Sequence, residues 1–266
     1  MKNNRQEFYD NSLSYFHASL ISHDLTEKFL SGKNIKFDRK YLEADDMIEL
    51  IMEDRIFSMD AIDFYRLFLV LNNSRVHRQE LPARKGVHEQ SPRGLYITTK
   101  IYNASVDGGV KNSVGIFLQK SDGEKNSGEA GLIINGMHIH NFMINESSPE
   151  TLGTIAFSLS AITAYQQNIN KIQLIAAGGE NYNSNHIGYF VWPKYGFDAS
   201  LEDGETDSWP ETFNSCKSVQ DVINIDENFW RKHGSQRLMT FDLSPGSASW
   251  AKLLEYTLGK QLWSKP

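Results

Sequence analysis

Cysteine is nearly absent from this sequence, because Cys216 is the only one in 266 residues. A single cysteine excludes an intrachain disulfide framework and suits a reducing compartment, and nothing around it indicates a nucleophile. Long apolar runs are also missing: none approaches the ~20 residues that a membrane-spanning helix needs. The first residues, through Phe8, lack the apolar core of a signal peptide. The sequence therefore predicts a soluble, cytoplasmic protein, with export only through a dedicated secretion system.

An excess of positive charge is lacking as well. The formal net charge is −6 and the pI is about 5.8, so a broad phosphate-binding surface is not expected. The clearest basic cluster runs from Arg75 to Lys85, with His77 inside it and His88 beside it. We interpret this cluster as a solvated connector, with an anion or nucleic-acid site as the alternative. Neither a membrane nor a nucleic acid is expected as a partner.

The first third of the chain has apolar residues at broadly helical spacing. The pattern runs from Phe8 to Leu30 and, more strongly, from Glu43 to Leu71. Ser58 or Asp60 could cap a second helix within the longer stretch. A polar, proline-containing connector follows from Asn72 to Gly94.

β-Branched and aromatic residues become frequent after Gly94. Strands are predicted at Leu95–Tyr102, Val114–Leu118, Gly131–Ile134, Met137–Ile144 and Lys171–Ala176, and around Leu238–Leu243. The second and third of these flank a polar, glycine-containing segment, which is typical of a hairpin. A short helix is predicted from about Asn185 to Lys194, and a final one from Ser247 to Leu258, capped by Ser247 or Ser249. We therefore divide the chain into a helical segment with its connector, residues 1–94, and a core with a C-terminal extension, residues 95–266.

A longer helix is predicted to begin near Pro149. Ser147 and Ser148 are candidate N-caps, proline suits the first helical position, and Glu150 lies three residues after Ser147, as in a capping box. Apolar residues then recur at helical spacing from Leu152 to Ile162.

One run carries a resemblance to a known family. It consists of Asn185, two residues, Gly188, three residues, Trp192, three residues, and Gly196-Phe197. This run resembles the late motif of the GNAT family of N-acetyltransferases, in which alanine and tyrosine stand at the second and third positions. The form Trp-Pro-Lys-Tyr-Gly-Phe also looks like GNAT-like domains of phage-associated and toxin-type proteins. The resemblance covers roughly residues 95–200 and implies an α/β fold: a GNAT-like central mixed sheet with flanking helices, to which the N-terminal helical segment is added.

The resemblance implies acetyl-CoA or CoA as the cofactor. The backbone of Phe142, Met143 and Ile144 would contact the pantetheine, and the start of the following helix would face the pyrophosphate, since a helix N-terminus favours anions. The residues that the resemblance assigns to this helix start are Thr151, Leu152, Gly153 and Thr154. Asn185 and Trp192 of the late motif complete the cofactor-binding set that it implies.

The helix start departs from the family pattern in its charge. Glu146 and Glu150 flank it, and no arginine or lysine lies between Asn135 and Asn170. At about 7 Å and an effective dielectric of about 20, one carboxylate would repel a phosphate charge by about 2 kcal/mol before screening. Acidic residues at this point also have a structural role, because they stabilise the start of a helix.

The catalytic assignments follow the same resemblance. The family's tyrosine acid falls at Trp192, whose indole cannot deliver its proton, so Tyr189 and Tyr195 are the candidate acids, with aromatic core packing as the alternative for all three. His138 and His140 share one face of a predicted strand and are the candidate bases. A metal site is the other interpretation of this His-x-His pair, but no third ligand accompanies it, so no metal is assigned.

Three functions remain open from the sequence. The first is acyl-CoA-dependent N- or O-acyl transfer to an unassigned acceptor, with a protein as one candidate, in a bacterial or phage effector or toxin. The second is a GNAT-shaped binding module that has lost CoA chemistry, which Trp192 favours. The third is an NAD-using, ADP-ribosyltransferase-like effector, prompted by the Arg93-Gly94 pair before a strand with Thr98 and Thr99.

Overall fold

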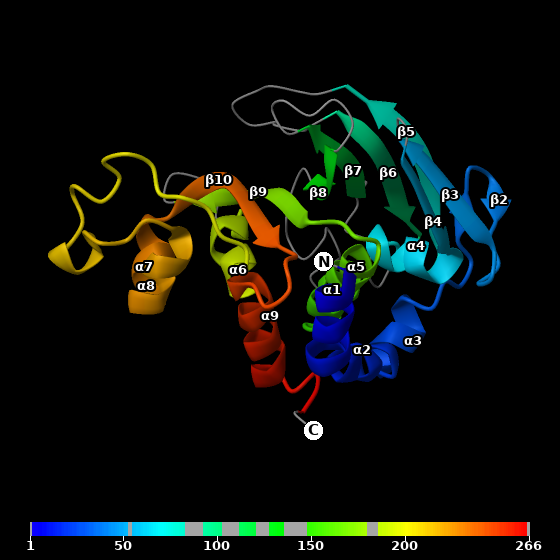
Figure 1. Ribbon diagram of the computed structural model, residues 1–266, viewed down its shortest axis with the longest axis horizontal. Coiled ribbons are helices and arrows are strands. Elements are labelled where there is room, and N and C mark those ends of the chain that lie inside the picture. The colour runs from blue at the N-terminus through cyan, green and yellow to red at the C-terminus, as the bar shows by residue number, and fades with distance from the viewer. Residues whose placement is uncertain are drawn as a thin grey trace.

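The computed structural model describes residues 2–52, 55–82, 93–102, 112–120, 128–135, 148–179 and 186–264. Within these ranges the chain forms a mixed sheet with helices packed against one face (Figure 1). The mixed α/β class expected from the sequence is therefore confirmed.

The main sheet has eight strands in the order β10-β9-β8-β7-β6-β5-β1-β2. Neighbours from β5 to β8 pair antiparallel, β8 and β9 pair parallel, β10 is antiparallel to β9, and β1 is parallel to β5. The strands are β1 (Lys36–Phe37), β2 (Lys40–Tyr41), β5 (Ser74–Leu81), β6 (Gly94–Ile101), β7 (Asn112–Lys120), β8 (Gly128–Asn135), β9 (Lys171–Gly179) and β10 (Ser235–Asp242). Strands from before and after residue 94 thus share one sheet.

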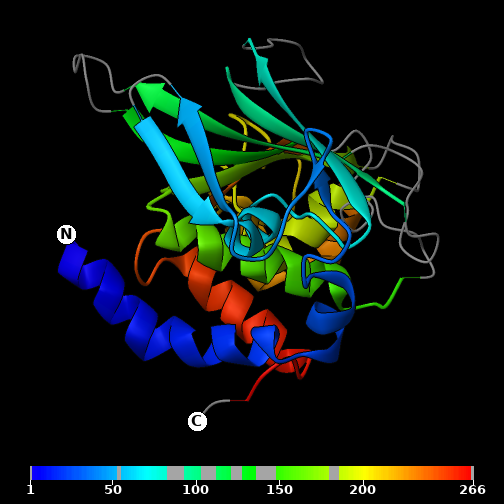
Figure 2. The same cartoon turned by 90° about the vertical axis from the view of Figure 1, so that its right-hand side faces the viewer.

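Helix α5 (Leu152–Gln166) connects the two parallel strands, β8 and β9. All of its residues from Leu152 to Tyr165 are buried, which explains why this stretch carries no charged residue. Figure 2 shows why: α5 lies directly beneath the sheet, and α9 (Ala248–Gly259) and the N-terminal helices lie beneath α5. The other helices are α1 (Lys2–Phe8), α2 (Ser14–Ile21), α3 (Asp24–Phe29), α4 (Ala61–Leu67), α6 (Gly188–Lys194), α7 (Val219–Ile225) and α8 (Glu227–His233).

The N-terminal helices are held to α5 by reciprocal hydrogen bonds. The Arg5 guanidinium donates to the Tyr165 carbonyl at 2.7 Å, the Tyr165 hydroxyl donates to the Arg5 carbonyl at 2.8 Å, and the guanidinium stacks on the Tyr165 ring. A π-helical turn (Tyr9–Leu13) follows α1, and the Tyr9 hydroxyl lies 2.8 Å from Nδ1 of the buried His17.

Several sequence predictions are confirmed. Strands β6, β9 and β10 and the β7–β8 hairpin lie where expected, α6 lies within its predicted range, and α9 begins after Ser247, whose hydroxyl accepts from the Trp250 amide. The strand predicted at Met137–Ile144 lies outside the described ranges.

The helix predicted over Glu43–Leu71 is wrong for most of its length. Residues Met47–Met52 (β3) and Arg55–Asp60 (β4) form a two-stranded hairpin, and only α4, capped by Asp60, is helical. The hairpin alternates buried and exposed positions but carries apolar residues on both, Ile51 and Ile56 among the exposed ones. Apolar residues on both faces hide the period of two, so the stretch resembles a helix.

Two further predictions are wrong. The expected connector over Asn72–Gly94 contains β5, an exposed strand whose polar side chains mask its alternation. The N-cap of α5 is Thr151, without a side-chain hydrogen bond, and not Ser147 or Ser148, and the Glu150 carboxylate meets Nζ of Lys260. Ser147 lies outside the described residues.

Candidate functional site

The candidate site lies where the two parallel strands end. β8 pairs with β9 from Gly131–Ile134 to Lys171–Leu174, whereas β9 goes on to Gly179 and, in the part of the chain that the structure describes, pairs there with β10. Helix α5 returns the chain to the start of β9, so its own first turn lies toward the carboxyl ends of these strands. In α/β sheets the carboxyl edge is where ligands bind most often.

Two glycines let α6 approach this edge closely. Gly178 has φ +118°, and a Cβ there would lie 1.7 Å from the His186 carbonyl oxygen. Gly188 opens α6 with a Cβ position only 3.0 Å from the Ala177 nitrogen. The small residue that the late motif requires at position 188 is thus explained by the contact between helix and strand.

Trp192 is packed into the core, 2% exposed. Its ring meets Phe157, Tyr195 and Phe197 edge to face, with centroids 5.3 to 5.8 Å apart. The Gly196-Phe197 pair belongs to the same packing: Gly196 has φ +96°, and a Cβ there would lie 2.3 Å from the Ser249 carbonyl oxygen of α9. The late motif therefore fixes how α6, α5 and α9 fit together.

The two candidate acids have their hydroxyls engaged. The Tyr195 hydroxyl lies 3.0 Å from Oγ1 of Thr154 in the first turn of α5, and burial raises the pKa of this tyrosine well above its usual range. The Tyr189 hydroxyl donates to the Arg231 carbonyl at 2.6 Å. Both side chains are buried, so each joins α6 to a neighbouring helix.

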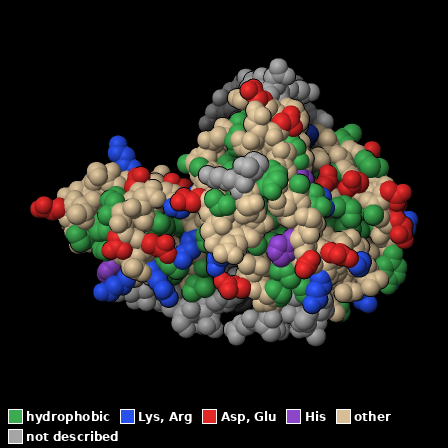
Figure 3. Space-filling model, turned by 90° about the horizontal axis from the view of Figure 1, so that it is seen from below, with side chains coloured by type: hydrophobic (Ala, Val, Ile, Leu, Met, Phe, Trp, Pro, Cys, Tyr) green, Lys and Arg blue, Asp and Glu red, His purple; other side chains and the backbone are tan. Residues whose placement is uncertain are grey.

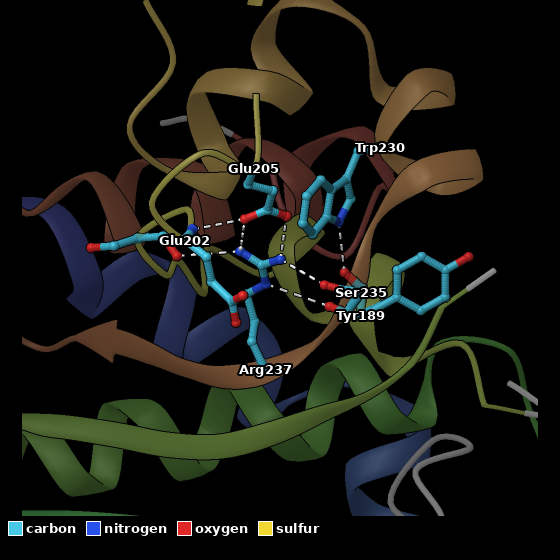
Figure 4. Close-up of polar contacts among 7 residues, drawn as sticks. Tyr189, Glu202, Glu205, Trp230, Ser235 and Arg237 are labelled. Carbon is cyan, nitrogen blue, oxygen red and sulfur yellow. Dashed lines mark hydrogen bonds and ion pairs between the residues drawn. The ribbon is translucent and has the colours of Figure 1, made fainter. Parts of the chain in front are cut away.

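Beside Tyr189 lies a partly buried polar cluster (Figure 4). The Trp230 indole donates to the Tyr189 carbonyl at 2.9 Å, and its ring stacks under the Arg237 guanidinium. Arg237 binds the Glu205 carboxylate with both terminal nitrogens, at 2.6 and 3.2 Å, and also donates to Ser235 Oγ. The Arg237–Glu205 ion pair thus connects the loop before α7 to the start of β10.

The start of α5 is the part of the edge that could hold an anion. Thr151 is half-buried, whereas Leu152, Gly153 and Thr154 are buried. Nζ of Lys260, at the end of α9, lies 2.6 Å from the Glu150 carboxylate, in front of this helix start. The sequence analysis missed Lys260 because it lies 110 residues away along the chain.

The remaining predicted site residues lie outside the described ranges. These are His138, His140, Phe142, Met143, Ile144 and Asn185. In the ranges that are described, no three His, Cys, Asp or Glu side chains gather as metal ligands, and no helix is long and apolar enough to cross a membrane. A groove of about 540 Å³ lies at the opposite edge of the sheet, between Arg5, the start of β9 and the end of β10.

Comparison with protein-family models, with curated proteins and with solved structures finds no match to this chain.

Proposed function

We propose that the chain is an acyl-CoA-dependent acyltransferase of GNAT-like architecture. The observation that carries this proposal is the sheet order. Strands β5 to β8 are antiparallel to one another, and β8 then pairs parallel with β9. On its other side, β10 exchanges backbone hydrogen bonds with the segment at Asp198, through Thr240. GNAT enzymes place their cofactor at such a junction, and the late motif lies beside it.

The cofactor's pyrophosphate would meet the first turn of α5. Thr151 and Lys260 are the groups available there, a hydroxyl and an ammonium that suit phosphate oxygens. Lys260 also offsets the charge of Glu150, which the sequence alone left uncompensated. When bound, acetyl-CoA supplies an activated thioester acyl group.

The chain's own contribution to proton transfer rests on four residues. Tyr195 is protonated at neutral pH and could donate once its hydroxyl turns from Thr154, although burial, which raises its pKa, makes it a weaker acid. Tyr189 is the second candidate acid. His138 and His140 remain the proposed bases, since histidine has a suitable intrinsic pKa.

A second candidate is a GNAT-shaped binding module without CoA chemistry. Its support is the packing of the motif: Trp192 fills the core where the family has its tyrosine, and the Tyr189 and Tyr195 hydroxyls already have partners. On this proposal the late motif serves architecture alone.

The NAD-using alternative receives little support from its own residues. A Cβ at Gly94 would lie 2.3 Å from the Ile116 carbonyl oxygen, so pairing of β6 with β7 explains this glycine. Thr99 is buried on the core side of β6.

Thermal unfolding in the presence of acetyl-CoA, CoA and NAD tests the three candidates. We expect millimolar CoA or acetyl-CoA to raise Tm, because a ligand that binds only the folded state stabilises it. Lys260→Gln should weaken the CoA effect several-fold, whereas Lys252→Gln, on the same helix but away from α5, should leave it unchanged. No shift with CoA on a folded protein overturns the acyltransferase, and a shift with NAD alone favours the third candidate.

If CoA binds, the tyrosines can be separated by their kinetics. Tyr195→Phe removes one hydrogen bond to Thr154 and should cost about 1 kcal/mol of stability. Loss of a general acid would in addition lower kcat about 100-fold or more without changing CoA affinity. An unchanged kcat would assign Tyr195 to packing.

A further inference from the structure

Three cations stand in a row on the outer face of the sheet. Lys36 on β1 is the cross-strand partner of Arg75 on β5, and Arg75 is the partner of Lys100 on β6. Cross-strand partners project to the same side, and adjacent strands lie about 4.8 Å apart, so the three side chains span about 10 Å. The neighbouring positions Val76 and Ile101 face the core, which places the row on the side away from the helices.

Exposed tyrosines flank this row. Tyr41, the β2 partner of Lys36, is 62% exposed, and Tyr102, just beyond β6, is 51% exposed. Nζ of Lys36 lies 4.7 Å from the Tyr41 ring centroid, and the Arg75 guanidinium and Lys100 Nζ lie 4.8 and 5.2 Å from that of Tyr102. Three adjacent cations thus have an exposed aromatic ring at each end of their row.

The arrangement is unfavourable for the sheet itself. Like charges at directly opposite positions destabilise a pair of strands, and here two such pairs are adjacent. In the described part of the chain none of the three cations forms an ion pair; the nearby carboxylate, Asp38, lies 3.9 Å from His77 and 3.8 Å from Arg78 instead. Like charges that face one another across strands, with no carboxylate to neutralise them, are characteristic of a binding surface.

We propose that this surface, formed by Lys36, Arg75, Lys100, Tyr41 and Tyr102, binds single-stranded nucleic acid. Such strands are held by cations that track the phosphates and by aromatic rings on which bases stack, and every base offers a face to a tyrosine. An acidic peptide would use the cations but would leave both exposed rings without a role. The overall charge of −6 confines attraction to this patch.

The row also lies at the same edge of the sheet as the candidate site. β6 runs parallel to β8 because both are antiparallel to β7, and Lys100 is close to the carboxyl end of β6. A strand that lies along the row toward Lys100 is therefore directed toward the carboxyl ends of β8 and β9. The binding itself does not depend on the proposed acyl transfer.

Fluorescence anisotropy with a labelled oligouridine of about 15 nucleotides, the scale of one such binding site, tests the proposal. We expect binding that weakens as salt rises from about 50 to 200 mM. The triple variant Lys36→Gln, Arg75→Gln, Lys100→Gln should lose at least about tenfold in affinity, and its log–log salt slope should fall by about 2. Tyr41→Ala and Tyr102→Ala should each weaken binding roughly fivefold or more.

The matched control is Arg231→Gln, Lys232→Gln, Lys252→Gln. It changes the net charge equally and should retain wild-type affinity. Figure 3 shows basic side chains gathered at the end of the molecule that α7 and α8 form, where two of these residues belong. Circular dichroism establishes that each variant is folded.

Three results would overturn the proposal. They are the absence of oligouridine binding by the wild type at low salt, an equal loss in both triple variants, and binding unaffected by either tyrosine change. In the last case, polyglutamate that competes as well as the oligouridine would assign the surface to an acidic protein partner.

Discussion

The two faces of the sheet obey different rules. On the covered face, the residues of the late motif are dictated by contacts: Gly178 and Gly188 admit α6, and Trp192 fills the space between α5 and α6. On the outer face, Arg75 and its neighbours stand where sheet energetics disfavour them. A family-like motif can thus reflect packing alone, whereas a residue that the fold does not need is the better sign of function.

The largest expected loss of stability comes from a substitution on the covered face. Gly178→Ala should lower the free energy of unfolding by about 4 kcal/mol or more, since the added Cβ would lie 1.7 Å from a backbone oxygen at a positive φ. Urea denaturation measures it. Gly246→Ala is the control: its φ is +70° but nothing lies within 4 Å of the Cβ, so about 1 kcal/mol is expected. Equal losses would mean that only backbone strain matters at Gly178.

A pH prediction compares the buried His17, on helix α2, with the exposed His77 on the outer face of the sheet. Burial, and then the charge of Arg66, lowers the pKa of His17 to about 4. The unfolded chain binds this proton more readily, so the stabilisation is present above about pH 6.5 and is lost as pH falls toward 4, by about 3 kcal/mol at most. His17→Gln should flatten the stability profile between these values.

The control for this prediction is His77→Gln on the outer face, whose side chain is 60% exposed. Its free energy of unfolding at neutral pH should match that of the wild type, because an exposed side chain contributes little packing. If His17→Gln unfolds with the wild-type pH dependence, the buried imidazole does not contribute, and the Tyr9–His17 contact is only a packing feature.

Paired and unpaired cations should also differ. Arg237→Met should lower the free energy of unfolding by about 2 kcal/mol, because it leaves Glu205 partly buried without its partner. Arg75→Met, on the outer face, should change it by less than about 0.5 kcal/mol. A double-mutant cycle with Glu205→Gln measures the coupling, and a coupling near zero would contradict the role assigned to this pair.

Sequence reasoning predicted the parts of the fold that carry a local signal. The β-branched and aromatic residues of Leu95–Tyr102, the pairing of β7 with β8 and the Ser247 cap each depend on near neighbours, and each is confirmed. The hairpin at Met47–Asp60 was missed because its exposed face is apolar, so the period of two disappears. A local sequence pattern does not predict secondary structure where exposed positions carry apolar side chains.

The candidate site shows a different limit. Lys260 meets Glu150 only through the packing of α9 beside α5, and the cation row needs β1, which is two residues long, to align with β5. Neither arrangement leaves a periodic trace in the sequence, since both depend on which strands and helices become neighbours. The basic cluster at Arg75 was visible, but its partners Lys36 and Lys100 were not.

The smallest expected effect is a gain in stability on the outer face. It tests the difference between the two faces most sharply, because the largest expected effect, on the covered face, is a loss of stability. Arg75→Glu converts two like-charged cross-strand pairs, with Lys36 and Lys100, into opposite-charged ones, each worth roughly 0.2–1 kcal/mol, and it loses the cation–π contact with Tyr102. The free energy of unfolding should therefore rise by about 0.5 kcal/mol at low salt, and less at 1 M salt, where such charges are screened.

Arg75→Gln should give about half this gain, which separates removal of repulsion from new attraction. If Arg75→Glu instead lowers the free energy of unfolding, the like charges of Lys36, Arg75 and Lys100 do not destabilise the sheet, and the proposed binding surface loses this support. A variant that becomes more stable and no longer binds the oligouridine would show that the cations of the outer face reduce stability and serve binding. The residues of the covered face, by contrast, serve stability.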